Sequence, residues 1–192
     1  MPIHLSPEVI RQASEGNKEA FRYLVEAYQA FAFAVSYRFV GNDDDAEDIV
    51  QEAFIRLWKS LPRYRQEIKI TTWLYRIIAN LCLDFLKSRR GKQRKNQVDI
   101  SVSHSVQDPD TPEKKLHRQE LMEAVWRAAE ALTPKQRAVF ILRDLEELPV
   151  EEVCSILSMS PGNIKSNLYY ARLKVSEKLK AFYQTTDNQF IT

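Results

Sequence analysis

Apolar residues recur at helical spacing along most of the chain. In the clearest stretch, which begins near Asp43 and ends at Pro62, they follow one another at steps of three and four: Ala46, Ile49, Val50, Ala53, Phe54, Leu57, Trp58 and Leu61. This spacing places them on one face of a helix of about four turns. Two earlier helices are predicted to begin at Ser6-Pro7 and at Asn17, and the second is predicted to end at Gly41.

A fourth helix is predicted to begin at Thr71 or Thr72 and to end near Arg90. Its inward residues are expected to be Leu74, Ile77, Ile78, Leu81 and Phe85. Only 4 glycines occur in 192 residues, prolines fall between the periodic segments, and the alternation typical of strands is almost absent. The pattern therefore predicts an all-α fold in which these N-terminal helices share one core.

Residues 96–111 (NQVDISVSHSVQDPDT) interrupt the helical pattern. They contain three Asp, no Lys or Arg and no large aromatic residue. We interpret this segment as a flexible acidic linker whose ends, in a coil, lie about 20–24 Å apart on average. It separates two small helical domains, predicted at residues 1–95 and 112–183, and residues 184–192 are predicted to be a tail.

The second domain contains a predicted helix-turn-helix. Helix starts are expected at four places: Thr111-Pro112, Thr133 with a capping box to Gln136, Pro149 and Ser160-Pro161. Residues 150–174 would form a short helix, a tight turn and a longer helix that enters a DNA major groove. The outward side chains of the longer helix are Asn163, Lys165, Ser166, Asn167, Tyr169, Tyr170 and Arg172. A helical hairpin with a solvated polar face is the alternative that this pattern leaves open.

The fourth helix carries a second polar stripe, opposite its apolar side: Trp73, Arg76, Asn80, Asp84 and Lys87. A cluster of cations without any acidic residue follows at its end: Lys87, Arg89, Arg90, Lys92, Arg94 and Lys95. Aromatic, amide and cationic groups together suit an unpaired nucleic-acid strand, which offers bases to stack and phosphates to neutralise. Alternatively, Trp73 packs into the core and the cations complement the C-terminus of a helix.

Composition and charge exclude several classes of protein. The totals of 28 Lys+Arg and 26 Asp+Glu hide an uneven distribution, because residues 1–95 carry 16 basic and 12 acidic side chains. Cys82 and Cys154 are too few for a disulfide scaffold, and no apolar run reaches the roughly 20 residues of a membrane span. We therefore expect a cytoplasmic protein without stable membrane insertion.

The sequence lacks the residue patterns that are typical of catalytic and metal-binding sites. A calcium loop starting at Asp43 would need Gly at position 48 and Glu at 54, where the chain has Asp48 and Phe54. The sequence contains no Gly-rich phosphate loop, no nucleophile motif and no paired catalytic carboxylates. We expect no enzyme activity, no cofactor and no metal site.

Three motifs, in this order along the chain, resemble the extracytoplasmic-function (ECF) group of bacterial sigma-70 factors. They are Asp45 to Phe54 (DAEDIVQEAF), Thr72 to Asn80 (TWLYRIIAN) and the helix-turn-helix with Gly162, Lys165, Ser166, Ala171 and Arg172. The resemblance extends from about Ala20 to Leu179. It implies a subunit that directs core RNA polymerase to specific promoters and helps to open the minus-ten element.

The resemblance also implies roles for individual residues. Core polymerase would bind Asp48, Gln51 and Glu52. The minus-ten element would be contacted by Tyr64, Arg65, Trp73, Arg76, Asn80 and Lys87. The minus-thirty-five element would be contacted by Asn163, Lys165, Ser166, Asn167, Tyr170 and Arg172. The partners implied are core RNA polymerase, promoter DNA and an anti-sigma factor that holds the protein inactive, and the acidic linker would thread toward the RNA exit path.

The chain departs from the family pattern at four positions. Gln66 and Ile68 replace a Gly and a Ser of the usual F-R-G-x-S-x-F-x-T-W loop, which bears on the base that this loop selects. Asn167 and Tyr170 stand where many relatives carry Arg, and each lost phosphate contact would make the salt dependence of DNA binding shallower by roughly 0.9. Two rival functions are a dimeric repressor or activator and a helical adaptor that binds protein only.

Overall fold

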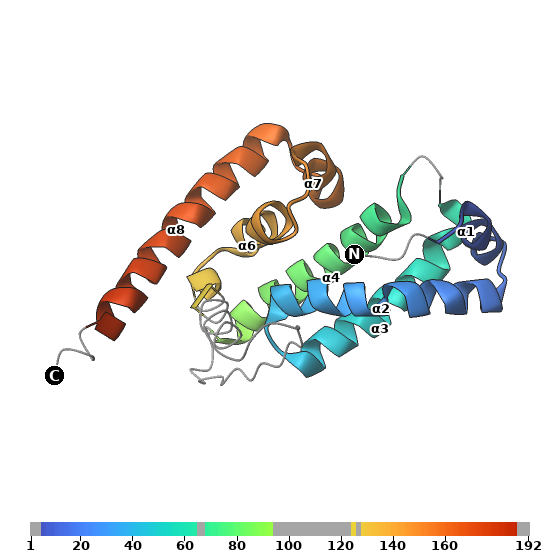
Figure 1. Ribbon diagram of the computed structural model, residues 1–192, viewed down its shortest axis with the longest axis horizontal. Coiled ribbons are helices and arrows are strands. Elements are labelled where there is room, and N and C mark those ends of the chain that lie inside the picture. Colours follow the sequence, from blue (N-terminus) through green and yellow to red (C-terminus); the bar gives the residue numbers. More distant parts are fainter. Residues whose placement is uncertain (1–4, 65–67, 94–123, 126–127, 188–192) are drawn as a thin grey trace. The chain divides into compact units, whose positions relative to one another are not determined.

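A computed structural model of the chain describes residues 5–64, 68–93, 124–125 and 128–187. All of its regular elements in these ranges are helices (Figure 1). Contacts within the chain define two compact units, one containing residues 1–98 and the other containing residues 99–154 and 159–192. The predicted linker at 96–111 and the helix start at Thr111-Pro112 lie outside the described residues.

The N-terminal unit is a small helical bundle. Its elements are α1 (Pro7–Ser14), α2 (Lys18–Val40), α3 (Asp43–Ser60), the short 3-10 turn η1 (Leu61–Arg63) and α4 (Ile70–Gln93). Helices α2, α3 and α4 each pack against the other two, and α1 packs against α2 and η1 (Figure 1). This arrangement leaves one long side of α3 and one of α4 outside the shared core.

The ends of the first three helices lie where the sequence predicted them. The Asn17 side chain accepts hydrogen bonds from the backbone N–H groups of Glu19 and Ala20, at 3.0 and 3.1 Å, and so caps α2. Gly41 ends α2 with φ at 72°, a left-handed conformation that glycine adopts without steric cost. Asn42 caps α3 by accepting from the N–H of Asp45 at 3.0 Å.

Helix α4 is longer than predicted, and its buried side is different. It begins at Ile70 because that residue is itself buried in the core, and the Lys69 carbonyl accepts from the N–H of Trp73 at 3.1 Å. Leu74 and Ile78 are fully buried as expected, whereas Ile77, Leu81 and Phe85 are only half-buried. The other buried positions are Thr72, Tyr75, Ala79, Cys82 and Leu86. Because α4 packs against both α2 and α3, its buried side is centred on different residues from those that the sequence predicted.

The C-terminal unit contains the predicted helix-turn-helix. Its elements are α6 (Pro134–Phe140), the π-helix η2 (Ile141–Leu145), α7 (Val150–Leu157) and α8 (Pro161–Asp187). The capping box is present, because the Gln136 N–H bonds to the Thr133 hydroxyl at 3.2 Å and the Gln136 side chain accepts from the Thr133 N–H at 3.1 Å. Helix α8 extends four residues into the segment that was predicted to be a tail.

One apolar cluster holds this unit together. It consists of Ala128, Ala129, Leu132, Phe140, Ala171 and Val175, with Val125, Leu145 and Leu179 packed against it. The turn between α7 and α8 depends on Ser158, whose φ of 52° is left-handed, and on a 3.2 Å hydrogen bond from the Met159 N–H to the Cys154 carbonyl. These features direct the N-terminal half of α8 outward, as the helix-turn-helix prediction requires.

Candidate functional site

The outward face of α3 carries the three residues predicted to bind core polymerase. Asp48 and Gln51 are exposed, and Glu52 is half-buried. The Glu52 carboxylate accepts a 2.7 Å hydrogen bond from Nε of Arg56 on the same helix. Ile55, four residues after Gln51 and 47% exposed, lies on this face and was not predicted. In the sequence, Ile55 is a large apolar residue that does not belong to the apolar stripe of α3, and this feature could have indicated it.

Tyr64 and Trp73 meet where the chain enters α4. Both side chains are half-buried, and their ring centroids lie 5.3 Å apart with the planes tilted by 58°. The Tyr64 hydroxyl donates to the Ile68 carbonyl at 2.5 Å. Burial raises the pKa of Tyr64, and the neighbouring Tyr28 raises it further. The ring and the hydroxyl of Tyr64 therefore both make contacts within the N-terminal unit. Arg65, also predicted to contact DNA, lies outside the described residues.

Arg76, Asn80 and Lys87 are exposed on α4, at the spacing of one helical side. Trp73 begins the same stripe. The sequence left open whether it packs into the core or offers its ring to a nucleic-acid base, and a half-buried ring is compatible with both roles. The ammonium of Lys87 lies 3.3 Å from the carboxylate of Asp84, a solvent-exposed pair within one helix turn. Side chains of the cationic cluster beyond Ser88 are outside the described set. Helix α4 thus brings an aromatic ring, a guanidinium and an amide to one surface.

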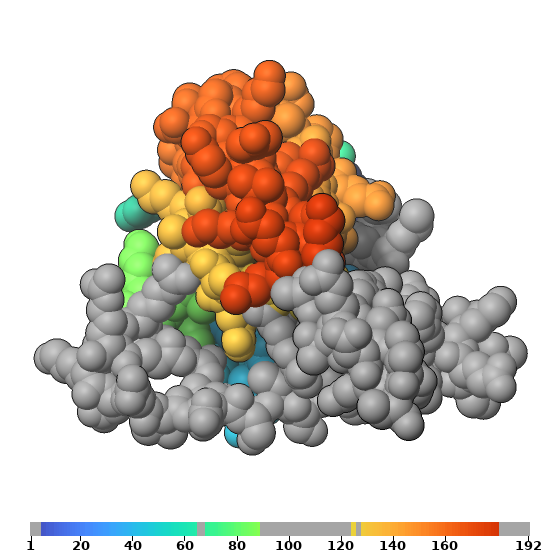
Figure 2. Space-filling view, turned by 90° about the vertical axis from the view of Figure 1, so that its left-hand side faces the viewer, coloured from blue at the N-terminus to red at the C-terminus, as the bar shows by residue number. Residues whose placement is uncertain are grey.

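The first half of α8 presents the residues predicted for the minus-thirty-five element. Asn163, Lys165, Ser166 and Tyr170 are exposed, whereas Asn167 is half-buried. The Asn167 amide donates to the Asn163 carbonyl at 2.8 Å, so it is engaged within the helix. Tyr169 is 64% exposed and its ring meets that of Tyr170 edge-on, with centroids 5.4 Å apart. Figure 2 shows this part of α8, in orange, on the visible surface.

Arg172 differs from the other cations predicted to contact DNA. Its Nε and Nη2 atoms lie 2.8 and 2.7 Å from the two carboxylate oxygens of Asp144 in η2. These hydrogen bonds raise the pKa of Arg172 above its usual range. Asp144 lies 28 positions before Arg172, and this pairing was not predicted from the sequence. No local pattern pairs two residues so far apart, because only the packing of η2 against α8 brings them together.

In the part of the chain that the structure describes, no group of three or more His, Cys, Asp or Glu side chains is placed to hold a metal ion. Nor does any helix there have the length and apolar character needed to cross a membrane. The polar faces of α3, α4 and α8 carry the residues that the sequence predicted for binding, and they are the candidate functional surfaces.

Comparison with known proteins assigns both units. Residues 24–92 match Sigma-70 region 2, and residues 122–175 match Sigma-70, region 4. The ECF RNA polymerase sigma factor SigW of Bacillus subtilis is 31% identical over 180 residues, which cover 89% of this chain and 95% of SigW. The chain belongs to the ECF group of the sigma-70 family. Its function is that of an ECF sigma factor, which directs core RNA polymerase to promoters.

Other relatives agree with this membership. The ECF RNA polymerase sigma-E factor of Escherichia coli K12 is 28% identical over 178 residues, covering 90% of this sigma factor and 93% of the relative. Solved structures show the same fold. CnrH, in complex with the cytosolic domain of CnrY, has a TM-score of 0.64 at 22% identity, with coverage of 91% of this chain and 96% of CnrH. RpoE of Bartonella quintana, in complex with the anti-sigma factor NepR, has the same TM-score and identity, with 83% and 96% coverage.

Family membership confirms the predicted fold class, function and partners. The chain is an all-α protein with a region 2 domain and a region 4 domain, and its partners as a sigma factor are core RNA polymerase and promoter DNA. Sigma factors are non-enzymatic initiation factors. The roles of individual residues are a separate question, which depends on the three surfaces described above.

Proposed function

We propose that this ECF sigma factor uses its three polar surfaces for three successive steps of initiation. The α3 face, with Asp48, Gln51 and Glu52, binds core polymerase. The α4 face binds the minus-ten element through Tyr64, Arg65, Trp73, Arg76, Asn80 and Lys87. The first half of α8 binds the minus-thirty-five element with the surface that contains Asn163, Lys165, Ser166, Asn167, Tyr170 and Arg172. The region 2 domain at 1–95 and the region 4 domain at 112–183 would then act through the linker at 96–111.

The observation that carries the proposal is the outward stripe of α4. The opposite side of this helix is fully buried, so Trp73, Arg76 and Asn80 face outward from a fixed support. Extracting a base from a duplex costs a few kcal/mol, and stacking or hydrogen bonding returns about 1–3 kcal/mol per base. Only a rigid surface held at the correct position compensates for this cost. The α4 stripe has the chemistry and the support for that role.

The minus-ten assignment is tested with Asn80→Ala. Loss of an exposed amide should slow open-complex formation on a duplex promoter, because one hydrogen bond to an unpaired base disappears. Gln29→Ala, which removes an exposed amide from α2, is the matched control. Run-off transcription from a duplex promoter and from the same promoter with a pre-opened minus-ten region measures the effect. Equal activity of Asn80→Ala and the control on the duplex would remove Asn80 from the interface.

The core-binding assignment has a closely matched control within the same unit. Gln51→Ala with Glu52→Ala removes an amide and a carboxylate that pairs with Arg56, four residues later. Gln29→Ala with Glu26→Ala removes the same groups from α2, and Glu26 pairs with Arg22, also four residues away, at 3.4 Å. We expect the α3 variant alone to lose affinity for core polymerase in equilibrium binding. The same affinity for both variants would contradict the assignment.

Ile55 extends the proposed core-binding face. An exposed isoleucine between carboxylate and amide side chains resembles the apolar centre and polar rim of protein interfaces. Ile55→Ala should therefore weaken core binding, whereas Tyr23→Ala, at a similar exposure of 52% on α2, should not. An Ile55→Ala variant with unchanged core affinity would limit the interface to the polar residues.

Regulation by an anti-sigma factor and a cytoplasmic location complete the proposal. Two solved sigma factors of the same fold were captured with a protein partner, CnrY in one case and the anti-sigma factor NepR in the other. Like other sigma factors, this chain is proposed to act beside RNA polymerase without catalysing a reaction itself. Affinity purification from its source, followed by competition of the recovered protein with core polymerase, tests the partner. A partner that leaves core binding unchanged would contradict inhibition.

A further inference from the structure

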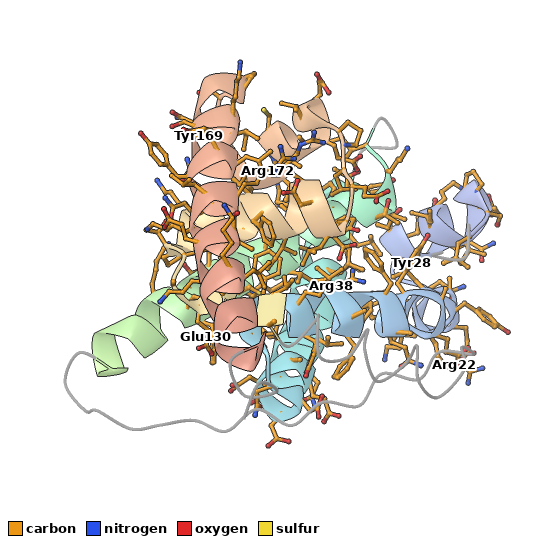
Figure 3. All side chains as sticks on the ribbon, turned by 60° about the vertical axis from the view of Figure 1, so that its left-hand side comes forward. Arg22, Tyr28, Arg38, Glu130, Tyr169 and Arg172 are labelled. Carbon is orange, nitrogen blue, oxygen red and sulfur yellow. The ribbon has the colours of Figure 1, made fainter. Side chains whose placement is uncertain are left out.

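Asp144 and Arg172 form a two-point ion pair between two elements of the C-terminal unit. Their two hydrogen bonds, at 2.7 and 2.8 Å, have the parallel geometry of a guanidinium facing a carboxylate. The Asp144 side chain is only 19% exposed, whereas that of Arg172 is 60% exposed. Figure 3 shows Arg172 on α8, and its partner lies in η2, an element that precedes the helix-turn-helix. The pair therefore joins α8 to the part of the unit that supports it.

Core contacts flank both members of the pair. Ala171, the neighbour of Arg172, is fully buried in the apolar cluster, and Leu145, the neighbour of Asp144, packs against the same cluster. Apolar contacts alone resist separation of η2 and α8 more than they resist rotation of α8 about its axis, because they have little directionality. Two parallel hydrogen bonds beside the core add a directional constraint, which fixes the side of α8 that faces outward.

The backbone of η2 also favours this role. The Glu146 N–H bonds to the Ile141 carbonyl at 2.9 Å, the wider spacing that defines a π-helix. The guanidinium of Arg143 bonds to the Leu148 carbonyl, which ties η2 to the segment leading into α7. Such π-helical turns are uncommon and often occur at functional positions. Arg143 and Asp144 thus link η2 to the segment before α7 and to α8.

We infer that Asp144 and Arg172 are positioning residues that orient α8 on the minus-thirty-five element, and that Arg172 does not serve as a cationic phosphate contact. This inference deepens the proposed DNA-binding function and rests on it. A cation contributes to the salt dependence of DNA binding through the counterions that it displaces. Because the positive charge of Arg172 is balanced by Asp144 within hydrogen-bond distance, the pair adds almost no net charge to the DNA-binding surface.

Salt dependence separates the two roles. A phosphate contact at Arg172 would make the slope of log affinity against log salt concentration shallower by about 0.9 when the cation is removed. A positioning role predicts weaker binding with an unchanged slope. It further predicts that Asp144→Asn, Arg172→Gln and the double variant all weaken binding, and that the double variant is no worse than Arg172→Gln, because each change removes the same constraint. The slope is compared in Arg172→Gln and in the double variant, since Asp144→Asn leaves the Arg172 cation unpaired.

The experiment uses holoenzyme and a duplex that ends upstream of the minus-ten element, taken from a promoter identified by run-off transcription. Affinity is measured at several KCl concentrations for Asp144→Asn, Arg172→Gln, the double variant and Arg172→Lys. We expect about two- to fivefold weaker binding for each, the range for exposed ion pairs of good geometry, and the wild-type slope for Arg172→Gln and for the double variant. Arg172→Lys keeps the charge but loses the two-point fork, so it should also be weakened.

Two further variants calibrate the measurement. Lys165→Gln removes an exposed cation from the same helix and should make the slope shallower, whereas Glu8→Gln, in an exposed pair on α1, should change nothing. Core affinity and binding of a single-stranded minus-ten oligonucleotide should be normal in all Asp144 and Arg172 variants, because these variants leave the N-terminal unit unchanged. Wild-type helix content by circular dichroism at the assay temperature excludes unfolding of the C-terminal unit as the cause.

Three results would overturn the inference: a shallower slope for Arg172→Gln, binding by Asp144→Asn that equals or exceeds that of wild type, or full affinity for Arg172→Lys. Failure of the proposed function itself would be recognised differently, because wild-type holoenzyme would then show no preference for duplexes that contain the upstream element.

Discussion

Tyr64→Phe removes a single hydroxyl at the entrance to α4. That hydroxyl donates to the Ile68 carbonyl at 2.5 Å, while the ring packs against Trp73 with a centroid distance of 5.3 Å. Phenylalanine keeps the ring contact and loses only the hydrogen bond.

The size of the effect follows from the environment of the bond. A net contribution of about 0.5–1.5 kcal/mol is usual for a neutral hydrogen bond, and water can replace the lost donor because Ile68 is half-buried. This corresponds to a factor of about 2–12 in the population that holds Tyr64 and Ile68 together. The affinity for the minus-ten strand should fall by up to that factor, because only this population presents Trp73 correctly.

The assay measures binding of a fluorescent single-stranded minus-ten oligonucleotide to holoenzyme. Tyr23→Phe, which deletes the same atom from a tyrosine that is 52% exposed on α2, serves as the control and should bind like wild type. Amide exchange at Trp73, whose N–H donates to the Lys69 carbonyl at 3.1 Å, should be faster in Tyr64→Phe, and this effect needs no DNA. If oligonucleotide affinity stays within twofold of the control, the hydrogen bond has no part in positioning Trp73, and the reasoning is wrong.

Three predictions concern stability. Ser36 is fully buried in α2 without a hydrogen-bond partner for its hydroxyl, so Ser36→Ala should raise the melting temperature of the N-terminal unit by roughly 4–8 °C per kcal/mol gained, with about 1 kcal/mol expected. Ser14→Ala, which removes a hydroxyl bonded to the Arg11 carbonyl at 2.7 Å, should give no such increase, and a lower melting temperature for Ser36→Ala would mean that the hydroxyl is paired. Thr133→Ala should destabilise the C-terminal unit by about 0.5–2 kcal/mol in urea unfolding, since it deletes the capping box of α6, and Thr133→Ser should restore the stability. Burial raises the pKa of Tyr28 and of Tyr64 above their ordinary 10.0, so the stability they contribute should be complete below pH 10 and should decline as the pH rises above it. In thermal melts above pH 10, the melting temperature of the double variant Tyr28→Phe with Tyr64→Phe should fall less with rising pH than that of the wild type. An identical fall would mean that the two tyrosines do not cause the pH dependence.

Local chemistry explains why so much of the fold could be predicted. The caps at Asn17 and Thr133 and the left-handed Gly41 act within a few residues, so the sequence predicts them without knowledge of the core. The outward stripe of α4 was likewise correct at Arg76 and Asn80. Its buried stripe was not, because it depends on which neighbours cover the helix. Helical period gives the existence of an apolar side, whereas packing against α2 and α3 decides its centre.

The candidate sites divide in the same way. Residue type and spacing were enough to indicate Gln51 and Lys165, since exposed polar positions on a helix follow directly from its period. Sequence alone could not indicate that the Tyr64 hydroxyl bonds to Ile68, that the Asn167 amide is engaged by its own helix, or that Arg172 belongs to Asp144. These are choices of hydrogen-bond partner, and the fold makes them by bringing donors and acceptors to within about 3 Å.

The sequence by itself determined where most of the described helices lie, the ends that have local caps and the chemistry that each helix carries, because helix period, capping and charge are properties of neighbouring residues. Only the tertiary structure decided which of those charges remain available to a partner. Arg172 and Lys165 are both cations on α8, yet one is bonded to a carboxylate 28 positions away and the other is exposed. Electrostatic interactions depend on distance in space, and that distance is set by the packing of η2 against α8.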